Sequence, residues 1–178
     1  MIHEGQILNQ HQCAELIAAP RHSKLANVTG GFAPNIRLVE QGEVAVDWLH
    51  PIIKSYIDDV LAIPFGLSEP RMFKTVFLKY STGFFYKAHQ DVIPNLPYRR
   101  VVSISIGLDS GYTGGELVFY EQGLSANITH THVSSVGTAI AFNSDAWHEV
   151  RPVTSGVRHA VVVWVSIPTV KNEITNLV

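Results

Sequence analysis

Apolar and polar residues alternate along the chain from about residue 71 to residue 168. The apolar positions are mostly β-branched or aromatic, and Gly, Pro, Asn or Asp separates each run from the next. Such runs are typical of short β-strands joined by turns. The pattern predicts eight strands, over residues 72–80, 84–91, 100–108, 116–120, 126–133, 138–142, 148–153 and 157–167.

The first 65 residues show helical periodicity at two places. Asn9 is a suitable N-cap for a helix that ends before Pro20. A second helix begins near Pro51, and apolar residues recur at helical spacing until Pro64. Residues 21–42 contain Gly and Pro and have no lasting period, which indicates either a long loop, of the kind that forms lids and binding loops, or irregular strands.

Eight strands without helices between them favour a β-sandwich or a double-stranded β-helix (jelly roll), with the two early helices packed outside one sheet. The chain has 178 residues, the size of one domain. We therefore expect a single, mainly β domain over residues 1–178. Its helical N-terminal part covers about residues 1–65, and its jelly-roll core covers about residues 71–168.

Charge and composition exclude several classes of partner. There are 13 Lys and Arg against 15 Asp and Glu, and no block of like charge favours nucleic acid or an anionic membrane. The single cysteine, Cys13, has no partner for a disulfide within the chain. The N-terminus lacks the pattern of a signal peptide, and the longest apolar run, residues 160–165, is too short to span a bilayer. We expect a cytoplasmic protein.

Candidate chemistry lies at the end of the second predicted strand. If residues 84–91 form a strand, the two-residue period places His89 and Asp91 on one face. His148 would then complete a set of two histidines and one carboxylate around a divalent metal. Taken alone, the His-x-Asp pair is a weak signal, because such residues also occur where strands end at ordinary turns.

Arg158 strengthens this interpretation. It begins the most apolar predicted strand, where a buried guanidinium is costly unless it has an anionic partner. Arg158 must therefore extend to the surface or bind a carboxylate. Its planar fork suits a bidentate contact with a carboxylate ligand better than a lysine would.

Three motifs occur in a fixed order: Y-x-x-G-x-x-Y-x-x-H-x-D at residues 80–91, G-G-E-L at 114–117 and H-E-V-x-P-V-T-S-G-V-R at 148–158. In this order the chain resembles the Fe(II)- and 2-oxoglutarate-dependent dioxygenases of the prolyl 4-hydroxylase type. The resemblance implies that His89, Asp91 and His148 are iron ligands. It also implies that Arg158 binds the distal carboxylate of 2-oxoglutarate and that Tyr80 helps to hold this cosubstrate.

The resemblance implies an activity as well. Such an enzyme hydroxylates a C–H bond and releases succinate and CO2, with Fe(II) as metal, 2-oxoglutarate as cosubstrate and ascorbate as a candidate reductant. A prolyl or other residue of a protein or peptide is the expected substrate, and a small molecule is also compatible. The loop after the iron-binding strand, residues 92–98, is expected to form the substrate entrance together with residues 21–42. The oligomeric state stays open.

Some positions near the site depart from the simple pattern. Tyr86 and His89 share a face only if the strand contains a bulge, because their separation is odd. Gly107 stands where related enzymes often carry an aromatic residue, which predicts extra room in the pocket. Ser103 and Ser105 share a face of the same predicted strand and are secondary candidates.

A second possible metal motif is incomplete. His130 and His132 form an H-x-H pair on a polar predicted strand, but the sequence offers no third partner, so we assign no site to it. Gly114 and Gly115 are expected to permit a tight turn or a bulge.

Two alternatives to a 2-oxoglutarate enzyme remain open. A cupin-like metal enzyme that does not use 2-oxoglutarate would not need Arg158 near the metal. In a jelly-roll binding module without enzymatic activity, the histidines and aspartate would be incidental.

Overall fold

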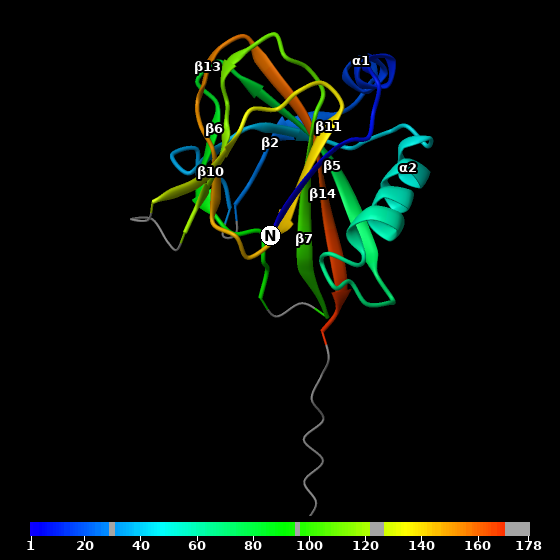
Figure 1. The fold of residues 1–178 in the computed structure, drawn as a ribbon. Helices are drawn as coiled ribbons and strands as arrows, with labels where there is room; N and C mark the ends of the chain where they lie inside the picture. The colour runs from blue at the N-terminus through cyan, green and yellow to red at the C-terminus, as the bar shows by residue number, and fades with distance from the viewer. Residues whose placement is uncertain (29–30, 95–96, 122–126, 170–178) are drawn as a thin grey trace, which may run out of the picture.

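In a computed structural model of the chain, which describes residues 1–28, 31–94, 97–121 and 127–169, two antiparallel sheets face each other (Figure 1). The larger sheet has seven strands, in the order β1 (Ile2–Gln6), β11 (Thr138–Asn143), β7 (Tyr98–Gly107), β14 (Val157–Pro168), β5 (Met72–Ser81), β4 (Glu40–Gly42) and β2 (Ser23–Leu25). The smaller sheet has five, in the order β10 (Ile128–His132), β9 (Leu117–Tyr120), β12 (His148–Val150), β6 (Phe85–His89) and β3 (Arg37–Leu38). The short strands β8 (Thr113–Gly114) and β13 (Val153–Ser155) pair with each other.

Apolar side chains from both sheets fill part of the space between them. Leu78, Ile140 and Phe142 of the larger sheet belong to one buried cluster with Leu117 and Phe119 of the smaller sheet. Each sheet thus buries one face against the other. This two-layer structure confirms the predicted jelly roll.

Strand β14 lies at the centre of the larger sheet and pairs along its length with both β5 and β7. Its Val161, Val163 and Val165 belong to the buried cluster that includes the helices, whereas Val162 packs against the cluster between the sheets. Burial on both faces explains why this strand is a nearly continuous apolar run instead of an alternating one.

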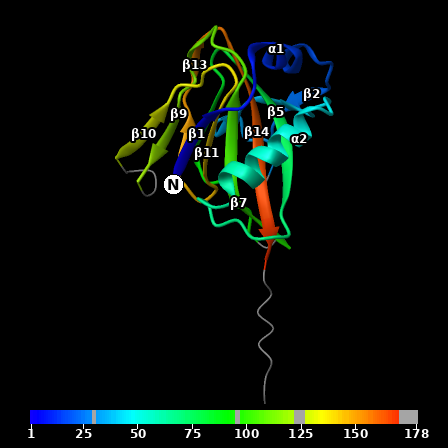
Figure 2. The ribbon, with the colours of Figure 1, turned by 45° about the vertical axis from the view of Figure 1, so that its right-hand side comes forward.

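Two helical segments cover the outer face of the larger sheet (Figures 1 and 2). Helix α1 (Gln10–Ala18) begins with a capping box, in which Asn9 and Gln12 bond each other's backbone amides. Helix α2 (Leu49–Ser55) continues as a π-helical segment, η1 (Tyr56–Leu61). Both predicted helices are therefore confirmed. Within the described ranges, no helix has the length and apolar character needed to cross a membrane.

The N-terminal half contains more sheet than the sequence pattern predicts. Strand β1 pairs with β11 in the larger sheet. Residues 21–42 contribute β2 and β4 to the larger sheet and β3 to the smaller sheet. These strands have two to five residues each, too few for a period to stand out. Their pairing partners determine their structure, so the open question of a loop or irregular strands resolves as short strands at or next to the sheet edges.

The other strands lie close to their predicted positions. The predicted strand 148–153 is divided into β12 and β13 at Arg151 and Pro152, because proline has no N–H to donate to a ladder. The predicted strand 126–133 corresponds to β10, although residue 126 lies outside the described residues.

Candidate active site

His89, Asp91 and His148 converge between the two sheets. His89 ends β6 and lies opposite His148, the first residue of β12, in the antiparallel register. The Nε2 atoms of His89 and His148 lie 3.6 and 3.7 Å from the two carboxylate oxygens of Asp91. One potential ligand atom from each of the three residues lies within 4.8 Å of those of the other two. The structure therefore brings together the three residues that the sequence motif singled out.

Asp91 reaches this position in a way that strand alternation does not explain. Strand β6 ends at His89, so Asp91 lies beyond it, and the predicted strand 84–91 is too long. The Asp91 amide donates to the carbonyl of Ser144 (2.8 Å), and the Ser103 hydroxyl donates to Asp91 Oδ2 (2.7 Å). A further hydrogen bond joins the hydroxyls of Ser103 and Ser144 (2.9 Å). Tertiary hydrogen bonds hold the carboxylate in place.

Backbone carbonyls orient both imidazole rings. His89 Nδ1 lies 2.8 Å from the carbonyl of Lys87, and His148 Nδ1 lies 2.9 Å from that of Ala146. A carbonyl only accepts, so each Nδ1 carries the proton and each Nε2 lone pair faces Asp91. This is the usual support for a metal-binding histidine.

The protonation states at this cluster favour metal binding. Burial, reinforced by the neighbouring His89, lowers the pKa of His148 to about 4, so its imidazole is neutral at pH 7. Burial alone would raise the pKa of Asp91, but interactions with the two histidines and Ser103 outweigh it and lower that pKa below its usual range. The cluster thus places the neutral imidazole of His148 and the carboxylate of Asp91 beside the imidazole of His89, a donor set that suits a divalent transition metal.

Aromatic rings enclose the two histidines. Phe142 packs edge-on against His148, with ring centroids 4.7 Å apart, and Tyr86 stacks on His89 at 3.5 Å. Tyr86 can face the same side as His89 because the pairing of β6 with β12 shifts by one residue between them, which is the bulge that this arrangement requires.

Arg158 lies in the same cavity and is 1% exposed. Opposite Tyr80 in the register of β14 and β5, its guanidinium carbon lies 5.2 Å from the Tyr80 ring centroid. Nη2 donates a long hydrogen bond to Ser134 Oγ (3.4 Å), and Nε has no partner in the described part of the chain. Among residues 1–28, 31–94, 97–121 and 127–169, no carboxylate lies within ion-pair distance of this guanidinium. An uncompensated buried cation is costly, so the cavity is suited to a ligand that carries a carboxylate.

Glycines make room for Arg158. A Cβ atom on Gly115 would lie 2.9 Å from Arg158 Cδ, and the φ of Gly115 is +70°. Gly115 is therefore needed both for the predicted turn and for the position of the arginine.

The expectation that Gly107 leaves room in the pocket is wrong. A Cβ atom there would lie 2.7 Å from the Ser135 carbonyl oxygen and 2.8 Å from Ser134 Cβ. The segment that carries Ser134 fills this space, and its hydroxyl is the group that contacts Arg158.

Several residues of the cavity escaped the sequence analysis. Ser105, a secondary candidate from the sequence, is one of the residues that line it. Arg37 and Trp164 also line it, and neither was singled out. Trp164 could have been found from the sequence, because it is an even number of residues from Arg158 on one predicted strand and therefore shares its face. Arg37 has none, since it lies on β3, which the pattern does not predict.

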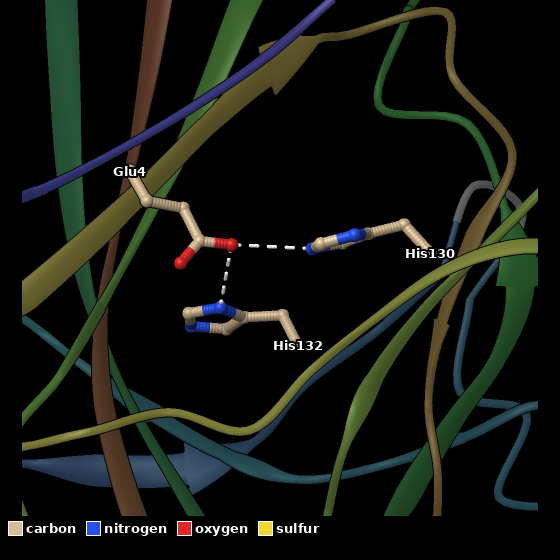
Figure 3. Close-up of side chains that lie close together, drawn as sticks. All are labelled: Glu4, His130 and His132. Atoms are coloured by element: carbon tan, nitrogen blue, oxygen red, sulfur yellow. Dashed lines mark hydrogen bonds and ion pairs between the residues drawn. The ribbon is translucent and has the colours of Figure 1, made fainter.

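A second cluster lies outside this cavity, on β1 and β10. His130 Nε2 and His132 Nδ1 each lie 3.1 Å from Oε1 of Glu4 (Figure 3). The expectation that the H-x-H pair lacks a third partner is therefore wrong. Glu4 precedes it by more than 120 residues and comes from an unpredicted strand.

Comparisons with known proteins agree with this geometry. A PKHD-type hydroxylase from Acaryochloris marina is 37% identical over 151 residues, which cover 81% of this chain and 62% of that protein. The chain thus spans less than two thirds of the length of this relative. In fold, it is similar to a prolyl-4-hydroxylase from Pseudomonas putida, with a TM-score of 0.69 and 22% identity over 92% of this chain and 91% of the other.

A second solved structure is a prolyl hydroxylase from Trichoplax adhaerens, in complex with a hypoxia inducible factor oxygen degradation domain peptide fragment. It has a TM-score of 0.69 at 18% identity and covers 92% of this chain and 82% of its own. The family model of the 2OG-Fe(II) oxygenase superfamily matches residues 75–166, which include the His89, Asp91 and His148 cluster and Arg158. By that match over more than half of its length, the chain belongs to the 2OG-Fe(II) oxygenase superfamily.

Proposed function

We propose that this chain is an Fe(II)- and 2-oxoglutarate-dependent hydroxylase. His89, Asp91 and His148 hold the iron, and Arg158 with Tyr80 holds the distal carboxylate of 2-oxoglutarate. The observation that carries the proposal is the buried guanidinium of Arg158, which has no anionic partner in the described residues and lines the same cavity as the three ligand atoms. A cupin-like enzyme without 2-oxoglutarate would not need Arg158 near the metal, and in a plain binding module the two histidines and Asp91 would be incidental.

Each residue of the cavity has a distinct task in this proposal. Three protein ligands leave further coordination positions for a bidentate 2-oxo acid and dioxygen. When bound, iron and 2-oxoglutarate supply the oxidation, which converts 2-oxoglutarate and dioxygen to succinate and CO2 and transfers one oxygen atom to a substrate C–H bond. The protein holds the reactants in register: Arg158 neutralises and orients the cosubstrate, and the rings of Tyr86 and Phe142 shield the metal ligands from water.

A residue of a protein or peptide is the proposed substrate, and proline is the first candidate. A groove beside Asp91 is lined by Val28 from one segment of the expected entrance and by Val92 and Ile93 from the other. It shares Arg37, Tyr86 and Trp164 with the cavity, so an extended chain lying in the groove could present one side chain to the metal. The peptide complex of the Trichoplax adhaerens neighbour supports this substrate class. Residues 29–30 and 95–96 of the expected entrance lie outside the described residues.

The proposal is tested by titrating metal-free protein with Fe(II) and then with 2-oxoglutarate in the absence of oxygen. The expected result is the weak visible charge-transfer band of a chelated 2-oxo acid. His148→Ala should remove the band, and Arg158→Gln should shift its appearance to much higher 2-oxoglutarate concentrations. Arg151→Gln is the matched control, because Arg151 is an arginine of the same region whose side chain is 44% exposed.

Metal binding without the band at any 2-oxoglutarate concentration would contradict the proposal and favour a cupin-like enzyme. No metal binding at this cluster would leave a binding module. If the band appears, succinate release is then measured in air, with ascorbate as reductant, against proline-containing peptides, and mass spectrometry detects the gain of one oxygen atom. The same peptides with His148→Ala enzyme give the background.

A further inference from the structure

Two edge strands face each other across the open side of the sandwich. Strand β1 is the outermost strand of the larger sheet, and β10 is the outermost strand of the smaller one. Glu4 on β1 lies opposite Ile140, which belongs to the buried cluster between the sheets. His130 and His132 on β10 lie opposite Phe119 and Leu117, of that same cluster.

Glu4, His130 and His132 therefore meet at the rim of the space between the sheets. In Figure 3 the Glu4 carboxylate extends from its strand toward both imidazole rings, and both rings point back toward it. His130 and His132 are two residues apart on one strand, so they project from the same face. No residue of this cluster belongs to the cavity that contains Arg158 and the His89 group.

The spacing of the three ligand atoms is close to that of a metal site. A Zn²⁺ ion lies about 2.0–2.2 Å from histidine nitrogens and carboxylate oxygens, so tetrahedral ligand atoms are about 3.3–3.6 Å apart. The distances from Glu4 Oε1 to His130 Nε2 and His132 Nδ1 are both 3.1 Å, and all three ligand atoms lie within 4.8 Å of one another. The three ligand atoms are thus close enough together for one ion to contact all of them after the side chains adjust.

The cluster is also accessible from one side and dry on the other. The side chains of Glu4 and His130 are 41% and 37% exposed, which leaves a path for an ion and space for a water as fourth ligand. His132 is 5% exposed, and its Nε2 has no partner in the part of the chain that the structure describes.

We propose that Glu4, His130 and His132 form a second metal site, for a divalent ion such as Zn²⁺, that ties the outer edges of the two sheets together. Imidazole ligands select Zn²⁺, Ni²⁺ or Cu²⁺ over Mg²⁺ or Ca²⁺. The role is structural: the ion links β1, near the start of the chain, to β10 across the open side of the sandwich. The site binds metal whether or not the cavity around Arg158 is loaded, because the two clusters share no ligand.

The test separates the two clusters by removing the first. Metal-free protein without a histidine tag, carrying His89→Ala and His148→Ala, is titrated with Zn²⁺ by calorimetry. One equivalent is expected to bind, and Co²⁺ in its place should give the visible absorption of a low-symmetry site. Adding either His130→Ala or Glu4→Gln to this background should abolish binding. His11→Ala, at an exposed histidine of α1, is the matched control and should retain it.

Thermal unfolding provides a second readout that does not depend on enzymatic activity. At a Zn²⁺ concentration about 100 times its Kd, the melting temperature of the His89→Ala, His148→Ala protein should rise by about 5–10 °C. The rise should disappear with His130→Ala. The proposal is overturned if the double variant binds no Zn²⁺, or if His130→Ala and Glu4→Gln bind it as the double variant does. In the first case the three residues are only a hydrogen-bonded cluster, and in the second any bound ion lies elsewhere.

Discussion

Replacement of Ser103 with alanine should weaken Fe(II) binding without removing any proposed ligand. The Ser103 side chain is completely buried, and its hydroxyl donates to Asp91 Oδ2 at 2.7 Å. A hydrogen bond to a charged group contributes about 1.5–3 kcal/mol, and each 1.4 kcal/mol corresponds to a tenfold change in affinity. The Kd for Fe(II) should therefore rise about 10- to 100-fold, the range measured for groups that support metal ligands.

The measurement is an anaerobic Fe(II) titration in competition with a chelator of known affinity. Ser105→Ala is the control, because Ser105 is buried on the same face of β7 and lines the cavity but is not among the groups found to bond Asp91 in the described residues. Melting temperatures of both variants, measured without metal, show whether the fold is intact. An Fe(II) affinity within twofold of the wild type in folded Ser103→Ala protein, or an equal loss in Ser105→Ala, would refute the assignment of Ser103 as the support of Asp91.

Three further outcomes follow from the same cavity. Arg158→Met should raise the melting temperature of the metal-free protein, because it removes a buried charge that has no anionic partner in the described residues. It should also abolish the stabilisation by 2-oxoglutarate that thermal melts of the wild type are expected to show. Gly115→Ala should raise the Kd for 2-oxoglutarate with little change for Fe(II), since its Cβ would lie 2.9 Å from Arg158 Cδ, whereas Gly111→Ala, which meets no atom within 4 Å, should change neither. The unfolding free energy of the metal-free protein should fall by roughly 3 kcal/mol between pH 7 and pH 4. The reason is that the unfolded chain binds a proton at His148 below about pH 6.5, whereas the folded chain binds it only below a pKa of about 4. Denaturant titrations of His148→Gln should therefore show a flatter dependence of the unfolding free energy on pH.

The fold was predictable where the strands are long. Strands such as β5, β7 and β14 have ten to twelve residues, enough for β-branched and aromatic side chains to mark them. The short strands β1 to β4 carry no such signal, because hydrogen bonds to neighbouring strands, and not their own composition, determine their conformation. Arg37 and Glu4, which lie on these strands, could not be associated with any site from the sequence.

The candidate site shows a different limit. The spacing of His89 and Asp91, together with the family resemblance that added His148, predicted their convergence, but the local reason was incomplete, because Asp91 lies beyond the end of β6. Its position depends on Ser103 and Ser144, which are distant in sequence. Ser103 was only a secondary candidate for the site, and Ser144 was not a candidate. At Gly107, reasoning about one residue failed because a loop from elsewhere in the chain fills the space that a missing side chain leaves.

Arg158 was predictable for a more general reason. A charge within a strongly apolar strand contradicts the local preference for burial, and such conflicts between sequence and structure concentrate where a protein binds something. The structure retains the conflict: the carboxylate of Asp91 accepts a short hydrogen bond from Ser103 (2.7 Å), whereas the guanidinium of Arg158 donates only a long one to Ser134 (3.4 Å) among the described residues. A group that folding alone leaves uncompensated is stabilised only when its ligand arrives. The stability of this cavity should therefore depend on 2-oxoglutarate far more than on any contact within the chain.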